Sequence, residues 1–87
     1  MHVILVYDAS DNRDRHALRI CRKYLHWTQN SVFEGRLTPA QLRLLRSELA
    51  THLNRHQDSV IVYTLQESTE LQRQVWGIDR GNTSPVI

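Results

Sequence analysis

Residues 27–41 read WTQNSVFEGRLTPAQ, and this stretch decides the fold. Its first part, Trp27 to Leu37, has the composition of strands on both sides of the polar dipeptide Asn30-Ser31. That pattern predicts two short strands joined by a tight reversal. The signals of a helix start follow at once, with an N-cap, a proline at the first helical position and the glutamine of a capping box: Thr38, Pro39 and Gln41.

Working outward, we expect a strand and a helix before this unit and a helix and a strand at its end. The apolar run His2 to Tyr7 predicts a buried strand. Helix-start residues follow it, and the first helix is expected to run to about Tyr24. The final strand is expected from Ser59 to Leu65. The apolar faces of the two helices are expected to consist of Ala17, Cys21 and Tyr24 with Leu18, and of Leu42, Leu45, Leu49 and Leu53.

The resulting order, β-α-β-β-α-β, is that of the ferredoxin-like split βαβ fold, an α+β class. It predicts an antiparallel sheet with both helices on one face, because right-handed crossovers place them there. Residues 1–65 form this core, within one domain of residues 1–87. The segment 66–87 contains a candidate fifth strand, Gln74 to Ile78, and the apolar end Pro85-Val86-Ile87. We expect this segment to pair with the sheet edge of a partner subunit.

The length of 87 residues allows one small core, and a second copy of the chain is a plausible source of further buried area. The only cysteine, Cys21, excludes an internal disulfide and fits a reducing cytosol, so a cytoplasmic location is expected. No apolar run approaches the roughly 20 residues of a membrane span. The stretch Val3 to Val6 is too short for the apolar region of a signal peptide.

The charge is unevenly distributed. From Asp11 to Arg46 there are eight basic and three acidic residues, which leaves a net charge of +5, whereas three basic and five acidic residues follow from Ser47 onward. Ten of the eleven cations are arginine, whose planar guanidinium suits phosphate. This asymmetry favours a polyanionic partner, and the alternative is an ordinary solvated surface.

Asp8 is the first candidate for chemistry. It ends a buried strand and opens a loop into a helix, where a carboxylate can hold Mg²⁺. The alternative is that Asp8 or Ser10 only satisfies the amides of the helix start. One carboxylate is a poor metal site, and Asp11 and Asp14 are explained by the helix dipole. A two-fold dimer in which Asp8 meets its symmetry mate supplies a second carboxylate.

A basic stripe on the first helix is the second candidate. Arg15, Arg19, Arg22 and Lys23 fall on one helical face, with Arg13 just ahead of them. Such a stripe can follow a phosphate backbone, and the alternative is again a solvated face. His52 and His56 have the i, i+4 spacing of zinc ligands, but we interpret them as residues at the end of the second helix. Cys21 reads as a small buried hydrophobe, and Phe33 as a core or interface residue rather than a stacking platform.

Several motifs occur together in one order: Val6-Tyr7-Asp8 with Ser10, then Arg13 and Arg15, then Gln29 to Gly35 (QNSVFEG), then Asp58-Ser59-Val60. With this length they resemble the small CRISPR-associated endoribonuclease of the spacer-acquisition pair, the "Cas-two" family. The resemblance covers nearly the whole chain, including the apolar end Ser84 to Ile87.

The resemblance implies a homodimer in which the two Asp8 carboxylates hold Mg²⁺, or another divalent cation, between the subunits. It implies metal-dependent cleavage of single-stranded RNA or double-stranded DNA, and a bridging role between dimers of the CRISPR integrase ("Cas-one"). The residues that it assigns to the site region or the nucleic-acid face are Tyr7, Ser10, Arg13, Arg15 and Phe33. Ser31 lies within the matched motif, and Arg19 and Arg22 extend the basic stripe.

Two classes of function therefore remain as hypotheses. The first is a phosphodiesterase with Asp8 as the metal-binding catalytic residue. The second is a non-catalytic adaptor whose arginine face holds duplex DNA. A third hypothesis is a toxin-like nuclease of the same fold that cleaves messenger RNA. A small-molecule regulatory domain is the least favoured, because the sequence indicates no apolar pocket for it.

Overall fold

The computed structural model describes residues 1–10, 12–66 and 70–79. In these residues the strands are β1 His2–Asp8, β2 His26–Gln29, β3 Val32–Arg36, β4 Ser59–Leu65 and β5 Gln72–Gly77, and the helices are α1 Asn12–Cys21 and α2 Pro39–His52. The strands form one antiparallel sheet in the order β2-β3-β1-β4-β5. The first four strands have the ferredoxin-like arrangement, which confirms the predicted fold class.

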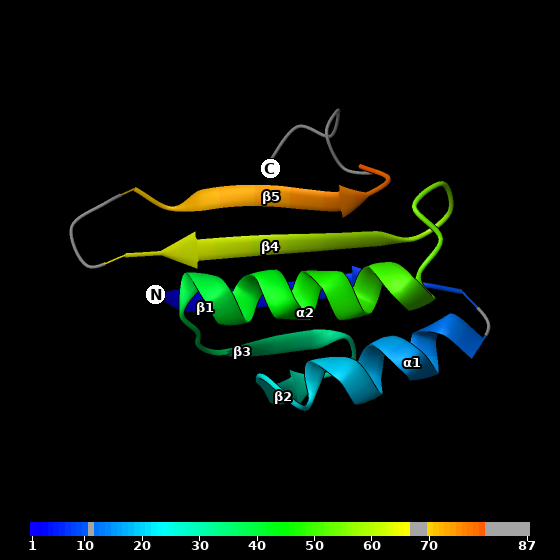
Figure 1. Cartoon of the computed structure of the whole chain (residues 1–87), viewed down its shortest axis with the longest axis horizontal. Coiled ribbons are helices and arrows are strands. Elements are labelled where there is room, and N and C mark those ends of the chain that lie inside the picture. The colour runs from blue at the N-terminus through cyan, green and yellow to red at the C-terminus, as the bar shows by residue number, and fades with distance from the viewer. Residues whose placement is uncertain (11, 67–69, 80–87) are drawn as a thin grey trace.

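Both helices cover the same face of the sheet, with α2 lying over β1 (Figure 1). The strand residues that alternate toward the helices are buried, as Val3, Leu5 and Tyr7 show in β1. They pack with Phe33 and the leucines of α2 into one hydrophobic core. Neither helix in the described residues is long and apolar enough to cross a membrane.

The start of α2 follows the sequence prediction. The Thr38 hydroxyl accepts a hydrogen bond from the Gln41 amide at 3.1 Å, and the Gln41 side chain accepts one from the Thr38 amide at 2.9 Å. This capping box satisfies backbone donors that the first turn leaves open. Leu42, Leu45 and Leu49 are buried as expected, and Leu53 forms the partly buried C-cap.

The end of α1 differs from the prediction. The helix ends at Cys21, not near Tyr24, and residues 22–24 form a turn. The amide groups of Lys23 and Tyr24 donate to the carbonyls three residues earlier, which tightens the chain out of the α-helix. Arg22 and Lys23 therefore follow the last residue of α1 and lie in the turn, and of the four residues of the predicted stripe Arg15 and Arg19 lie on the helix.

The fifth strand is present and spans Gln72–Gly77, where Gln74 to Ile78 was expected. β5 pairs with β4 of the same chain from Ser59↔Gly77 to Thr64↔Gln72, and pairing of the segment 66–87 with a partner subunit stays a prediction. This pairing satisfies the edge of β4, which would otherwise expose its backbone groups. The strand ends at Gly77, where φ is +88° and an added Cβ would lie 2.3 Å from the Asp58 carbonyl oxygen. The apolar end 84–87 lies outside the described residues.

In the part of the chain that the structure describes, both helices lie on one face of the sheet and none covers the opposite face (Figure 1). It presents the alternate residues of the central strands, and the register pairs Ile4 with Tyr63 and Val6 with Ile61. Val75 lies beside Ile61 on β5. These apolar side chains are partly exposed, and Ile4 is 36% exposed. We call Ile4, Val6, Ile61, Tyr63 and Val75 the open-face patch.

Candidate metal and nucleic-acid site

Asp8 lies where the sequence places it, at the last position of β1 and exposed. Its place in the strand alternation puts it on the face of the open-face patch, opposite Ser59 of β4. It lines a cleft of about 440 Å³ at this end of the sheet, together with Asp14 of α1 and with Trp27, Asn30 and Ser31 of the β2–β3 hairpin.

Tyr7 forms the inner wall of this cleft. Its side chain is 4% exposed and its ring stacks on Phe33, with 5.9 Å between the centroids. Its amide donates to the Ser31 carbonyl at 3.1 Å, which holds β1 to the hairpin turn. Burial raises the pKa of Tyr7, and the charge and hydrogen bonding of the Asp14 carboxylate raise it further. The hydroxyl therefore remains protonated, so Tyr7 can donate a hydrogen bond but cannot serve as a base.

The donor set of the cleft fits Mg²⁺ in part. Asp8 and Asp14 supply carboxylate oxygens, the ligand type that Mg²⁺ takes in ones and twos while it keeps several waters. Within the described residues no group of three or more His, Cys, Asp or Glu side chains could hold a metal ion. One chain thus offers part of a coordination shell, and the remaining oxygens must come from water, substrate or a second chain.

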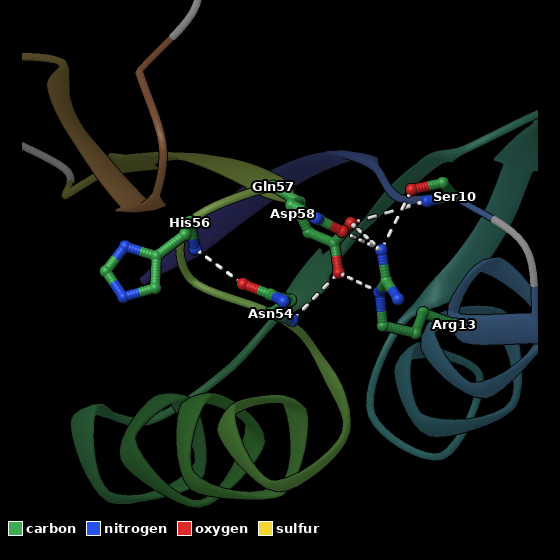
Figure 2. Close-up of polar contacts among 6 residues, drawn as sticks. All are labelled: Ser10, Arg13, Asn54, His56, Gln57 and Asp58. Atoms are coloured by element: carbon green, nitrogen blue, oxygen red, sulfur yellow. Dashed lines mark hydrogen bonds and ion pairs between the residues drawn. The ribbon is translucent and has the colours of Figure 1, made fainter.

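Arg13 forms an ion pair with the buried Asp58 (Figure 2). Its Nε donates to Asp58 Oδ2 at 2.6 Å and its Nη2 donates to Oδ1 at 3.2 Å. The same Nη2 lies 2.9 Å from Ser10 Oγ and from Gln57 Oε1. The backbone amides of Ser10 and Asn54 also donate to the Asp58 carboxylate, at 3.3 and 2.8 Å. We call Ser10, Arg13, Asn54 and Asp58 the Asp58 clamp.

The clamp changes the expected roles of Arg13 and Ser10. Arg13 is compensated by a carboxylate of its own chain, so its observed role is to hold the start of α1 against the loop before β4. Ser10 is held by the same network only two residues after Asp8. Burial alone would raise the pKa of Asp58, but the bonds from Arg13 and from the Asn54 and Ser10 amides outweigh it and lower that pKa.

The other cations lie in three different settings. Arg15 and Arg19 are exposed on α1, and Arg19 Nη2 lies 2.9 Å from His16 Nδ1. The Arg22 guanidinium lies over the ring of Trp27, 5.5 Å from its centroid. Lys23 pairs with Glu48 of α2, which also accepts a hydrogen bond from Tyr24. Of these cations, Arg22 contacts a residue of the cleft that contains Asp8, namely Trp27.

The remaining candidates have structural settings. His52 stacks on His16 of α1, 4.7 Å between centroids, while His56 lies in the loop after α2, so the two do not form a pair of ligands. Cys21 is buried, and burial raises the pKa of its thiol to about 12, which fits an inert core residue. Phe33 is fully buried beneath Tyr7 and offers no exposed face for stacking.

A second cavity of about 400 Å³ lies between α2 and the strands β4 and β5. Leu49, Leu53, Val60 and Trp76 contribute apolar walls, and Arg46 stands over the Trp76 ring at 5.4 Å. The expectation that the chain forms no apolar pocket is therefore wrong. Its lining combines residues of α2, β4 and β5 that lie apart in the sequence, which local sequence patterns do not indicate.

Sequence reasoning missed three residues of this region. Trp27 is an exposed indole on a strand whose four residues are all exposed, and a large aromatic among polar neighbours was the available signal. Asp14 was assigned to the helix dipole, yet it faces the same cleft as Asp8. Asp58 was part of a quoted motif without a role, because its partners lie 45 and 48 residues away in the chain.

Comparison with known proteins connects these features to one family. The family profile "CRISPR associated protein Cas2" matches residues 1–73. Proteins named CRISPR-associated endoribonuclease Cas2 from Frankia alni and Dictyoglomus turgidum are 44% and 38% identical over 87 residues, covering 100% of each chain. The crystal structure of Streptococcus pyogenes Cas2 is 31% identical, with a TM-score of 0.70, and the match covers 78% of this chain and 89% of that one. The chain therefore belongs to the Cas2 family of CRISPR-associated proteins.

Proposed function

We propose that this protein is a metal-dependent endoribonuclease of CRISPR adaptation, with Asp8 as its catalytic metal ligand. The observation that carries the proposal is the position of Asp8, exposed in a cleft of about 440 Å³ beside a second carboxylate, Asp14. The names of the full-length relatives from Frankia alni and Dictyoglomus turgidum support RNA as the substrate class.

The proposal includes a homodimer that forms through the open-face patch. Partly exposed apolar side chains on an uncovered sheet face are a typical surface for association. Asp8 follows Ile4 and Val6 on the same face, so a two-fold axis through this patch brings two Asp8 side chains toward each other. This arrangement supplies the further carboxylate that a single chain lacks.

In this proposal each residue of the site has its own role in metal binding, RNA binding or positioning. Asp8 and its symmetry mate hold the cation, and Arg15 and Arg19 bind phosphates along the RNA backbone. Tyr7, kept protonated, donates a hydrogen bond within the cleft, and the Asp58 clamp holds the loop that follows Asp8. A bound Mg²⁺ supplies charge neutralisation at the phosphate and lowers the pKa of a coordinated water.

The direct test replaces Asp8 by asparagine, which keeps the size of the side chain and removes its charge. We expect RNA cleavage to fall by about 100-fold or more, because one electrostatic contact in a reacting site is worth that much. Glu70→Gln is the matched control, since Glu70 is an exposed carboxylate outside the cleft. Undiminished cleavage by the purified Asp8→Asn protein would mean that the activity resides elsewhere. Chelation of divalent cations with EDTA must abolish the wild-type activity. A parallel cleavage assay with duplex DNA as the substrate shows whether the protein is also a DNase.

A second candidate function is an adaptor that carries DNA and bridges integrase dimers. The observation in its favour is that Arg15 and Arg19 are exposed on α1, an element separate from the strand of Asp8. This reading predicts duplex DNA binding that Asp8→Asn leaves intact and Arg15→Ala with Arg19→Ala weakens. A spacer-acquisition assay on Asp8→Asn beside the nuclease assay separates the two functions.

A further inference from the structure

Trp27 stands out among the aromatic residues of the cleft. It is 50% exposed, whereas the other tryptophan, Trp76, is 8% exposed. It lies on β2, an edge strand in which every residue is exposed. An exposed indole alone needs no explanation, but this one lines the same cleft as Asp8. The ring thus lines one cleft with the carboxylate to which we assign the cleavage.

The indole is held in place before any ligand arrives. Its Nε1 donates to the Asn30 carbonyl at 2.7 Å, and Asn30 itself occupies the tight reversal with φ +45°. The Arg22 guanidinium lies over the ring at 5.5 Å, a cation–π contact. A ring fixed in this way loses little conformational freedom when a ligand stacks on it, which favours binding.

We propose that Trp27 is the stacking platform for an unpaired nucleobase next to the phosphate cut at Asp8, and thus the residue through which this site distinguishes single strands from duplexes. This inference rests on the proposed function and deepens it. The cleft volume of about 440 Å³ lies within the range of small-ligand pockets, roughly 300–1,000 Å³. Aromatic stacking of this kind tolerates any base, since every base has a flat π-face.

The negative charges of the cleft are compatible with a neutral nucleobase as its ligand. Without a bound cation, Asp8 and Asp14 repel a phosphate but not a neutral base. The phosphate on the other side of the stacked nucleotide, away from Asp8, fits nearer Arg22, whose guanidinium lies over the ring. A base within a duplex has both faces covered by its neighbours, so only an unpaired base can stack on Trp27. The geometry therefore selects single strands by stacking, while the arginines bind either form by charge.

Intrinsic fluorescence tests the stacking directly. In the Asp8→Asn, Trp76→Phe protein Trp27 is the only tryptophan, and the RNA is not cut during the titration. The probes are a short single-stranded RNA, the same sequence as a duplex, and an abasic strand of the same length and charge. We expect the single strand to quench Trp27 and the other two to bind without quenching. Single-strand binding, followed by the anisotropy of a labelled strand, without quenching would overturn the proposal.

Kinetics give a second and independent readout. Trp27→Ala is expected to raise KM by about five- to 150-fold, the worth of one base–aromatic stack, and to change kcat little. Trp27→Phe should recover most of this loss, whereas Trp27→Leu, apolar but without a π-face, should not. Leu44→Ala, at an exposed apolar position of α2, is the control for general surface effects. Equal KM values for the Trp27→Leu and Trp27→Phe variants would exclude stacking.

The failure of this inference can be told from the failure of the proposed function. If Asp8→Asn retains cleavage while Trp27 is still quenched by single strands, the stacking platform stands and the catalytic assignment fails. If cleavage depends on Asp8 but Trp27 is not quenched and Trp27→Ala keeps the wild-type KM, the stacking platform alone is wrong.

Discussion

Arg13 and Asp58 form a two-point ion pair across 45 residues of sequence, with Nε to Oδ2 at 2.6 Å and Nη2 to Oδ1 at 3.2 Å. The carboxylate side chain is 2% exposed and the guanidinium side chain 25% exposed. The Asp58 carbonyl also accepts the Ile78 amide at 2.9 Å, beside Gly77. A single residue thus joins α1, the loop after α2 and the end of β5, close to the loop that follows Asp8.

Removing this charge should destabilise the fold. We expect Asp58→Asn to lower the free energy of unfolding by about 3 kcal/mol, the lower end of the range for breaking a buried pair, because Arg13 is partly exposed. Urea denaturation at neutral pH measures this change. The control is Asp79→Asn, which breaks the exposed pair with Arg73 at 3.4 Å and should cost about 0–1 kcal/mol. Equal losses of unfolding free energy in the two variants would mean that the Asp58 clamp stabilises the fold no more than an exposed ion pair does.

The same ion pair predicts acid sensitivity. The pKa of Asp58 is lowered in the folded protein, so the folded state binds fewer protons than the unfolded state in acid. The stabilisation is therefore complete at neutral pH and is lost as the pH falls from about 5 through the folded pKa. The free energy of unfolding, measured across this interval, should fall more steeply for the wild type than for Asp58→Asn. Parallel curves would exclude Asp58 as a source of acid lability.

A second pH effect is expected near neutrality, at His16. Burial against its surroundings lowers the pKa of His16, and the charges of His52, Arg19 and Arg15 lower it further. The unfolded chain then binds more protons than the folded one as the pH falls through about 6.5, so stability should decrease there. His16→Gln should flatten the stability curve between about pH 7.5 and 5.5. An NMR titration in which His16 keeps its ordinary pKa would contradict the argument.

The fold was predictable because its signals are local. The capping box at Thr38 and the turn dipeptide Asn30-Ser31 each specify a boundary within a few residues, and both are present in the structure. The end of α1 has no such signal. Arg22, Lys23 and Tyr24 all permit a helix, and the turn is accompanied by contacts of Lys23 and Tyr24 with Glu48 of α2. Helix ends of this kind depend on tertiary contacts and are not visible in sequence periodicity.

The candidate site was predictable in part. Asp8 could be found from its place after a buried strand, because strand ends commonly carry functional side chains. The clamp could not be found, since it depends on a pairing between Arg13 and Asp58 that only the sheet order brings together. Trp27 could not be placed either, because alternation in a four-residue edge strand does not indicate which neighbouring groups share its cleft.

The exposed arginines of α1 lead to a prediction about salt. Removing one arginine–phosphate interaction should reduce the slope of log binding constant against log salt by about 0.7 for single-stranded RNA. We therefore expect Arg15→Ala and Arg19→Ala to weaken binding and flatten this slope. Arg43→Ala, an equal charge change on the exposed side of α2, is the control. If Arg43→Ala flattens the slope as much, RNA binding is a property of net charge and not of the α1 surface.

The last prediction concerns the open-face patch and the metal site that we propose two chains share. Ile61 lies on β4 beside Val6 and Val75, on the sheet face opposite the two described helices. Ile61→Glu should leave the core intact, because the core residues Val60 and Val62 point to the other face. In the dimer, however, the carboxylate introduced at position 61 would be buried against a second copy without a partner charge. The cost of burying that charge opposes association strongly. Sedimentation equilibrium should therefore show a dimer for the wild type and a monomer for Ile61→Glu.

The matched control is Leu44→Glu, which places the same charge at an exposed apolar position, 58% exposed, on the helical side. It should remain dimeric. Loss of the dimer separates the two Asp8 carboxylates, so the Ile61→Glu monomer should bind Mg²⁺ more weakly by calorimetry and lose metal-dependent cleavage together with it. A monomer that cleaves RNA at the wild-type rate would show that one chain completes the site alone, with Asp14 as the second carboxylate of the cleft.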